Sequence, residues 1–357
     1  MSDVTLQNIT KHFKAVTALR KVSFDIKDGE FFVLLGPTGA GKTTTLRVIA
    51  GLEKQDEGSV LFDGSPMDTL TPPERDVAFV FQQYSLYPTM SVFDNLAFPL
   101  RSPLRRVPAG QIKQRVEEVA GMLRIDHLLG RKTAHLSGGE MQRVSIGRAL
   151  VREPRIYLMD EPLSNLDAKL REALRVELKH LQKTAGSTTL FVTHDQIEAL
   201  TMADRIAVLN QGQIVQIGMP DDIYDRPATT FVAQLVGTPR INLMDAVCEN
   251  STLHVVNSQV HLPIPESCGE GRLPETFLLG VRPEDVQPGE SGQFDGQLML
   301  TEPLGVETIL HIKSGEKTFL SIVPGMTYLR IGDSLKFNII QERLHYFDLD
   351  GVRLPVS

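Results

Sequence analysis

The chain has 357 residues, of which 41% are hydrophobic and 23% are charged, and both fractions are ordinary for a globular protein. Its 37 Lys and Arg residues against 44 Asp and Glu give a formal net charge of −7, which argues against a nucleic-acid partner because phosphate-backbone binding needs a basic surface. No stretch approaches the roughly 18 consecutive apolar residues of a membrane span, and residues 1–4 do not begin a secretory signal.

Length and charge distribution together predict two domains. Residues 240–357 hold 9 basic and 16 acidic residues, whereas residues 1–239 hold 28 of each. This shift places a boundary near residue 239, and a chain of this length suits two domains. Cys248 and Cys268 show no metal or redox spacing, so we expect ordinary thiols in a cytosolic protein.

The first elements in chain order are strands. Residues 4–9 and 22–26 alternate in polarity, with a polar loop carrying Phe13 between them. Residues 31–35, and later 156–159 and 190–192, are short apolar runs typical of strands that are buried on both faces. Because helical patterns separate these runs, we expect an α/β fold with a largely parallel sheet.

A phosphate-binding loop follows the strand at residues 31–35. The segment Gly36-Pro37-Thr38-Gly39-Ala40-Gly41-Lys42-Thr43 matches GxxxxGK[ST] without a mismatch, and a helical stretch from Thr44 follows it. Glycines let backbone N–H groups curl toward phosphate oxygens, and the helix N-terminus adds partial positive charge. The pattern predicts that Lys42 reaches the β- and γ-phosphates of ATP and that Thr43 binds Mg²⁺.

Residues from about 83 to 150 form a mostly helical insertion. Ile112, Val116, Val119 and Leu123 share one helical face. Near its end, Ser137-Gly138-Gly139-Glu140 precedes a helical run, with Ser137 as the N-cap. Uncovered N–H groups there would make a second anion site, which two head-to-tail copies could place on one nucleotide. A plain capped helix with a flexible start fits the same residues.

Two carboxylates end the next buried strand. Asp160 is expected to hold Mg²⁺, and Glu161 is the obvious general base for an attacking water. Another strand ends at Thr193-His194, where Thr193 and Gln196 fit a capping box. His194 and Gln82, which follows a strand at residues 77–81, are by themselves ordinary polar strand ends.

The remaining sequence is rich in β-strand signals. Residues 205–209 and 214–217 predict a hairpin around Gly212. From about residue 240, Gly and Pro punctuate short alternating runs, which predicts an all-β domain, a small barrel or pair of barrels.

The ordered set of P-loop, Gln82, residues 136–140, Asp160-Glu161, residues 164–167 and His194 resembles an ABC transporter ATPase. Residues 80–88 and 280–285 resemble the bacterial importer branch. The C-terminal part, through residues 344–348, is similar to the domain in ATPases of maltose, glycerol-3-phosphate and related carbohydrate importers. The resemblance thus covers essentially the whole chain and implies a P-loop ATPase domain followed by an OB-like domain for dimerisation or regulation.

The resemblance implies a role for each site residue. Residues 36–44 would cradle ATP, and Phe13 would stack on adenine. Gln82 would sense the γ-phosphate or Mg²⁺, and His194 would position water and Glu161. Across a dimer, Ser137, Gly138 and Gly139 would bind the γ-phosphate and Asp167 would touch the opposite P-loop. Glu140, in place of the usual Gln, puts a carboxylate near phosphate and predicts modest repulsion.

The resemblance also implies partners. These are a second ATPase subunit, two permease subunits, and a periplasmic or lipid-anchored solute-binding protein, with the chain on the cytoplasmic face of the membrane. A groove around residues 84–98, with Tyr84, Tyr87 and Phe93 as its apolar dock, would receive a cytoplasmic helix of the permease. The implied solute is a sugar or sugar derivative. The alternatives are an importer ATPase for a polyamine, iron or a polyol, and an ABC ATPase switch without transport.

Overall fold

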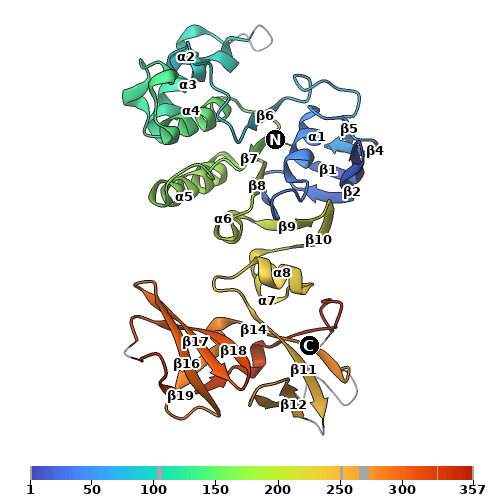
Figure 1. Ribbon diagram of the computed structural model, residues 1–357. Coiled ribbons are helices and arrows are strands. Elements are labelled where there is room, and N and C mark those ends of the chain that lie inside the picture. Colours follow the sequence, from blue (N-terminus) through green and yellow to red (C-terminus); the bar gives the residue numbers. More distant parts are fainter. Residues whose placement is uncertain (1, 103–106, 250–251, 265–272, 328, 356–357) are drawn as a thin grey trace. The chain divides into compact units, whose positions relative to one another are not determined.

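The computed structural model describes residues 2–102, 107–249, 252–264, 273–327 and 329–355 (Figure 1). Internal contacts divide the chain into two compact units, Met1–Pro220 and Asp221–Ser357, and each is described by itself. Cys268 lies outside the described residues.

A six-stranded sheet forms the centre of the first unit. Its strand order is β10-β9-β3-β8-β7-β6, and all strands run parallel except β10, which pairs with β9 as an antiparallel hairpin. The strands are β3 (Phe31–Leu35), β6 (Val77–Val80), β7 (Ile156–Asp160), β8 (Thr189–Thr193), β9 (Arg205–Asn210) and β10 (Gln213–Gly218). Every residue of β3, β7 and β8 is buried, which confirms the prediction from their apolar runs.

The register of this sheet brings three strand ends together. Leu35 pairs with Thr193, and Val192 pairs with Asp160. The segments that follow β3, β7 and β8 therefore leave the sheet at one edge, where ligands bind in open α/β sheets.

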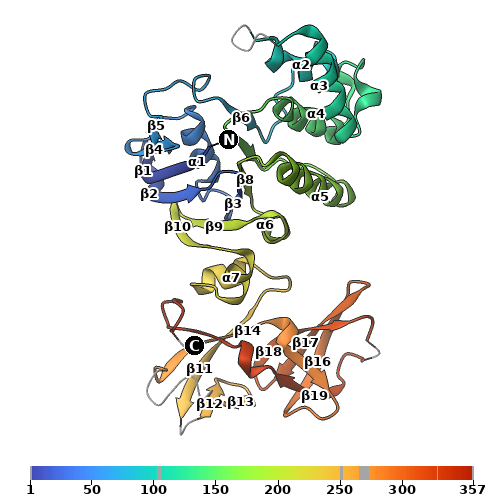
Figure 2. The same cartoon turned by 180° about the vertical axis from the view of Figure 1, so that it is seen from behind.

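Helices cover both faces of the sheet. Figures 1 and 2 show α1 (Lys42–Ala50) on one face and α5 (Ala168–Ala185) with α6 (Gln196–Met202) on the other. Asp167 caps the start of α5, because its side chain accepts from the Leu170 N–H at 3.0 Å. The Asp195 side chain caps α6, so the predicted capping box at Thr193 is wrong; Thr193 still belongs to β8.

A second, antiparallel sheet lies in the same unit, with the order β2-β1-β4-β5. Its strands are β1 (Val4–Phe13), β2 (Val16–Ile26), β4 (Glu57–Phe62) and β5 (Ser65–Pro66). The predicted polar loop around Phe13 is wrong, because β1 continues to Phe13 and pairs it with Val16. Backbone pairing does not require apolar side chains, so polar Lys11 and His12 stay in the ladder.

The insertion is helical, as predicted. It contains α2 (Val92–Ala97), η1 (Phe98–Arg101), α3 (Ala109–Met122), η2 (Asp126–Leu128), η3 (Thr133–His135) and α4 (Gly138–Leu150). Gly147 permits the close packing of α4, since a Cβ there would lie 2.8 Å from Leu96 Cδ2 and 3.0 Å from Leu123 Cδ1.

Among its described residues, the second unit is all-β apart from two short helices and two 3-10 turns. One five-stranded sheet has the order β13-β12-β11-β14-β20 and the other β15-β19-β16-β17-β18, and every pairing is antiparallel. The elements are α7 (Pro220–Asp225), α8 (Thr230–Leu235), β11 (Asn242–Glu249), β12 (Thr252–Val255), β13 (His261–Pro263), β14 (Thr276–Val281), η5 (Pro283–Asp285), β15 (Val286–Gly289), β16 (Phe294–Pro303), β17 (Glu307–Ser314), β18 (Lys317–Pro324), β19 (Ser334–Ile339), η6 (Gln341–Arg343) and β20 (His345–Phe347).

Buried Arg282 ties the two short helices to this β unit. Its Nη1 donates to the carbonyls of Ala233 and Val236 at 3.0 and 2.6 Å, and its Nη2 donates to that of Tyr224 at 2.8 Å. The compact units accordingly divide at Pro220, earlier than the shift in charge near residue 239. The functional boundary at 239 stays a prediction.

In the part of the chain that the structure describes, none of the helices combines the length and apolarity that crossing a bilayer requires.

Candidate active site

The P-loop fills the turn between β3 and α1, and two of its glycines, Gly36 and Gly41, are sterically required. A Cβ at Gly36 would lie 2.3 Å from the Leu209 carbonyl oxygen. Gly41, the N-cap of α1, has φ 109°, and a Cβ there would lie 2.6 Å from the Ala18 carbonyl oxygen. The loop can therefore curl tightly only with glycine at these positions.

Lys42 lies within this curl. Its side chain is 5% exposed, and Nζ donates to the carbonyls of Gly36 and Pro37 at 2.9 and 3.0 Å. Nζ also lies 3.5 Å from Glu161 Oε1. The cation is thus held between the loop that would cradle phosphate and the carboxylate beyond β7.

Thr43 and Asp160 form a pair of oxygen ligands beside Lys42. The Thr43 Oγ1 hydroxyl donates to Asp160 Oδ1 at 3.0 Å. Burial raises the pKa of Asp160, while the Thr43 hydrogen bond opposes that shift and nearby Glu161 adds to it. A cation bound here would favour the ionised carboxylate.

Glu161 stands in an unusual backbone conformation. Its φ is 45°, in the left-handed region that residues with a side chain seldom adopt. Three hydrogen bonds hold it there: its N–H donates to the Val192 carbonyl at 3.0 Å, and its carbonyl accepts from the Ser164 Oγ and N–H at 2.9 and 3.3 Å. Strain of this kind persists where surrounding structure enforces it, and it clusters at functional sites.

Three side chains from distant segments meet at the Glu161 carboxylate. His194 Nδ1 lies 3.0 Å from Oε2, and Gln82 Nε2 donates to the same oxygen at 3.3 Å. Lys42 approaches the other oxygen. In the sequence these four residues follow different strands. They lie together in the structure because the strands run parallel and end at the same edge of the sheet.

Sequence reasoning missed a second layer behind His194. Glu198 is 3% exposed, and its Oε2 accepts from Thr193 Oγ1 at 2.5 Å. The same Thr193 oxygen accepts from the Asp195 N–H at 2.9 Å. Burial raises the pKa of Glu198, and the Thr193 hydrogen bond opposes the shift. These hydrogen bonds hold Thr193 and Asp195, the two residues on either side of His194 in the chain.

The Ser137-Gly138-Gly139 segment begins α4 as predicted. Ser137 is its N-cap and forms a capping box with Glu140, whose Oε2 accepts from the Ser137 N–H and hydroxyl at 2.7 and 2.8 Å. These bonds, the backbone one first, lower the pKa of Glu140. Glu140 thus engages the hydroxyl that is expected to bind phosphate.

No hydrogen bond or ion pair among the described residues joins this segment to the P-loop of the same chain. Gly139 instead packs beside the start of α5, where a Cβ would lie 2.8 Å from Leu170 Cδ2. The two anion sites are therefore not joined by any such bond within one chain.

Phe13 lies at the end of β1. Its side chain is 42% exposed, and Lys11 Nζ lies 5.2 Å from the ring centroid. An exposed aromatic ring of this kind can accept a stacked base.

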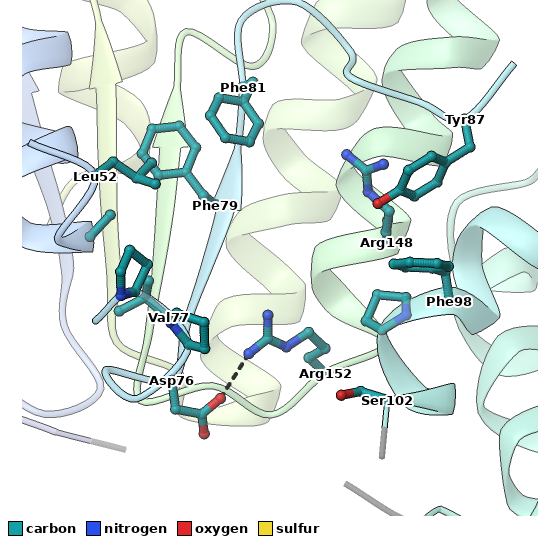
Figure 3. A pocket seen from close by; sticks show the side chains of 14 residues that line it. Leu52, Asp76, Val77, Phe79, Phe81, Tyr87, Phe98, Ser102, Arg148 and Arg152 are labelled. Atoms are coloured by element: carbon teal, nitrogen blue, oxygen red, sulfur yellow. Dashed lines mark hydrogen bonds and ion pairs between the residues drawn. The ribbon is translucent and has the colours of Figure 1, made fainter. Parts of the chain in front are cut away.

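A groove of about 650 Å³ lies beside the insertion (Figure 3). We call it the aromatic groove. Phe79 and Phe81 lie on one side and Tyr87 and Phe98 on the other. Of the three aromatic residues expected to form an apolar dock, only Tyr87 lines this groove; the Tyr84 hydroxyl lies near Gly138 instead, and Phe93 lies under Arg101.

Comparisons with known proteins agree with this geometry. A family model described as ABC transporter matches residues 19–164, and a TOBE domain model matches residues 279–347. The trehalose/maltose import ATP-binding protein MalK of Thermococcus litoralis is 46% identical, over 98% of each chain. The sn-glycerol-3-phosphate import ATP-binding protein UgpC of Psychromonas ingrahamii is 45% identical, over 98% of this chain and 95% of that protein.

A solved structure provides the same fold. It is an ATP-binding cassette in a dimeric post-hydrolysis state with bound ADP and phosphate; it is 35% identical, with a TM-score of 0.56 over 61% of this chain and 98% of that one. Family, fold and site geometry thus lead to one conclusion: the chain belongs to the ABC transporter family of ATP-binding proteins and is an ATPase.

Proposed function

We propose that this chain is the ATP-hydrolysing subunit of an importer that energises uptake of a sugar or sugar derivative. The observation that carries the proposal is the meeting of Lys42, Gln82 and His194 at the Glu161 carboxylate, beside the Thr43–Asp160 pair. A P-loop, an acidic pair and a histidine in this arrangement suit the hydrolysis of a nucleoside triphosphate.

The residues present fit MgATP. At Gly36 and Gly41 the curl leaves no room for a Cβ, so the backbone can turn tightly enough to bring its N–H groups toward phosphate. A hydroxyl and a carboxylate are the hard oxygen ligands that Mg²⁺ takes, and Thr43 and Asp160 supply both, with Gln82 as a further ligand.

Each side chain then has a definite task. ATP would supply the phosphoanhydride that is cleaved, and Mg²⁺ held by Thr43 and Asp160 would offset its charge. Glu161 accepts the proton of the attacking water at its carboxylate. His194 holds that carboxylate through Nδ1, and Lys42 presents a positive charge toward the terminal phosphates.

Two copies of the chain would complete the site. Ser137, Gly138 and Gly139 begin a helix whose N–H groups suit an anion, and no bond in the described residues joins them to their own P-loop. In a dimer, these N–H groups would bind the nucleotide held by the opposite chain, and Asp167 would touch the opposite P-loop. The related cassette described above is dimeric.

The remaining partners are two permease subunits, which would dock at the aromatic groove, and a solute-binding protein on the far side of the membrane. The chain would then lie on the cytoplasmic face. The two relatives named above import trehalose and maltose, or glycerol-3-phosphate. These names favour a sugar or sugar derivative over a polyamine or iron, and no observation favours a switch without transport.

Uptake measured in the source organism tests the proposal. A strain lacking this chain should lose uptake of labelled trehalose, maltose or glycerol-3-phosphate, and the wild-type chain should restore it. Glu161→Gln should not restore uptake. The matched control is Glu53→Gln. The Glu53 carboxylate pairs with Lys11 Nζ at 2.9 Å and is not among the residues that meet at Glu161. Unchanged uptake of all three solutes in the deletion strain would contradict the assignment.

A further inference from the structure

Arg171 is a cation in the first turn of α5, an end of the helix where the dipole disfavours positive charge. Its side chain is 32% exposed, and its Nε is buried with no hydrogen-bond partner among the described residues. A buried donor that is left unpaired costs free energy, as does a cation at this end of a helix. The position is therefore unfavourable for α5 itself, and the other contacts of the guanidinium need a reason beyond the stability of that helix.

One set of contacts joins Arg171 to the segment that follows Glu161. Its Nη2 donates to the Leu166 carbonyl at 3.0 Å and, over a longer distance of 3.5 Å, to the Ser164 carbonyl. Ser164 in turn donates to the Glu161 carbonyl through both its Oγ and its N–H. Arg171 therefore holds the residues that keep Glu161 in its left-handed backbone conformation.

The other contact joins Arg171 to the residue that follows His194. Its Nη1 lies 3.5 Å from Asp195 Oδ2. The second oxygen of the same carboxylate, Oδ1, caps α6, where it accepts from the N–H groups of Ile197 and Glu198 at 2.7 and 3.3 Å. The Asp195 carboxylate thus ties the start of α6 to the start of α5, directly beside the histidine.

The imidazole of His194 depends on this support from its own backbone. Its side chain is 52% exposed, and in the described part of the chain its one side-chain hydrogen bond joins Nδ1 to Glu161 Oε2 at 3.0 Å. Because little packs around so exposed a ring, its position follows that of the backbone beside it. The distance between the imidazole and the carboxylate is therefore set by two segments, and the guanidinium of Arg171 contacts both.

We infer that Arg171 is a positioning residue for ATP hydrolysis. Its guanidinium clamps the segment after Glu161 to the segment after His194, and so fixes the carboxylate and the imidazole relative to each other. A planar guanidinium suits this task because its donors point in fixed directions, whereas a single ammonium group cannot bind both segments at once. Arg171 acts through other residues and touches neither ATP nor the attacking water. The inference rests on the roles proposed above for Glu161 and His194.

The test compares ATP hydrolysis and ATP binding in the full-length chain. Arg171→Met keeps a long side chain without donors, and it should lower kcat by about tenfold or more, because small misplacements of reacting groups are costly. The Kd for ATP should change by less than about threefold, since the P-loop contacts remain. Lys169→Met is the matched control: it removes an exposed cation from the same turn and should keep kcat within about twofold. Unchanged kcat in Arg171→Met would overturn the inference.

The split between kcat and Kd separates positioning from general support of the fold. If Arg171→Met weakens ATP binding in parallel with kcat, the residue only supports the fold and the inference is wrong. Arg171→Lys decides the matter if the methionine variant does not fold. It keeps the charge but can bind only one of the two segments, so kcat should fall by about threefold or more at an unchanged Kd. A lysine variant as fast as wild type would contradict the clamp.

A double-mutant cycle tests whether Arg171 acts through Asp195. Asp195→Asn keeps a good N-cap for α6 and removes the charge that faces the guanidinium. Because either change alone breaks the clamp, the chain that carries both should be no slower than the slower single variant. Losses that multiply would mean that the two residues act independently, which would overturn the inference. Failure of the proposed role of Glu161 is distinguishable, because Glu161→Gln would then keep its kcat; failure of the clamp alone leaves Glu161→Gln inactive and Arg171→Met active.

Discussion

At the scale of single residues, one carboxylate organises the site. Glu161 is held in a left-handed backbone conformation and is contacted by a lysine, an amide and an imidazole that come from three different segments. Such an arrangement orients the carboxylate before any substrate enters, which is the condition for effective general-base catalysis.

Lys42→Ala should weaken ATP binding. Removing one charge-assisted contact to phosphate costs roughly 1.5–3 kcal/mol, or about 10- to 150-fold in Kd. Titration with ATP measures the change, and Lys54→Ala, an exposed lysine, serves as the control. Equal affinity in wild type and Lys42→Ala would mean that the lysine is not a phosphate ligand.

Glu198→Leu should lower kcat with little change in KM. Without the carboxylate, Thr193 loses its acceptor and His194 is no longer held, and misplacement of this kind costs on the order of 10- to 100-fold. Glu198→Gln should recover most of the rate, because its amide oxygen still accepts from Thr193. A KM effect alone, or no rescue by glutamine, would count against this role.

Sequence motifs predicted Lys42, Asp160 and Glu161, since each belongs to a recognisable strand or loop pattern, whereas the role of His194 was implied by the family resemblance alone. They could not predict the left-handed conformation of Glu161, because it arises from bonds to Val192 and Ser164 in other segments. Glu198 was missed for a related reason. A carboxylate in the first turn of a helix looks like a solvated, dipole-stabilising residue until the structure shows it buried.

At the scale of elements, the boundary predicted from composition and the contacts in the structure differ over α7 and α8. Composition placed a boundary near residue 239, where the charge balance changes. Contacts instead join both helices to the β unit, because Arg282 donates to the carbonyls at the end of α8 and in α7. Net charge is a property of surfaces and does not record which core a helix packs against. The buried strands were predictable because their apolar runs are set by local burial.

A fragment of residues 1–220 should therefore bind ATP as tightly as one of residues 1–239 and be at least as soluble. The longer fragment carries α8 without Arg282, so Val232 and Ala233, which are buried in the full chain, would face water. Isothermal titration and size-exclusion chromatography of both fragments check this. Folding of the longer fragment alone would instead support the boundary near 239.

At the scale of the whole molecule, a buried acid should make stability depend on pH. Burial raises the pKa of Asp285 to about 6, although Arg343 lies 3.3 Å away and opposes the shift. The folded chain therefore binds this proton more tightly than the unfolded chain does, whose carboxyl has a pKa near the model-peptide value of about 3.9. Stability from this group is greatest at low pH and is lost as pH rises through about 6.

Asp285→Asn removes that dependence. Relative to wild type, the variant should gain on the order of 1 kcal/mol in unfolding free energy between pH 5 and pH 8. Burial lowers the pKa of His345 to about 3, so this group makes stability rise with pH. It does so in the wild type and in the variant alike, and its effect cancels in the comparison. Urea unfolding at the two pH values measures the difference, and a variant that tracks wild type at both would refute the prediction.

The central claim is that MgATP is held between two copies of the chain, with Glu161 as the base on one and Ser137 at the contact from the other. Size-exclusion chromatography with light scattering, with and without MgATP, tests it most directly. Glu161→Gln should dimerise when MgATP is added, because binding survives and hydrolysis falls by about 10²–10⁴. Adding Ser137→Arg should abolish this ATP-dependent dimer while ATP binding remains. The matched control is Ser91→Arg, since Ser91 also caps a helix of the insertion but has no role at the contact. If the Glu161→Gln/Ser137→Arg chain dimerises with MgATP as fully as Glu161→Gln alone, the nucleotide is not shared between two copies in this way.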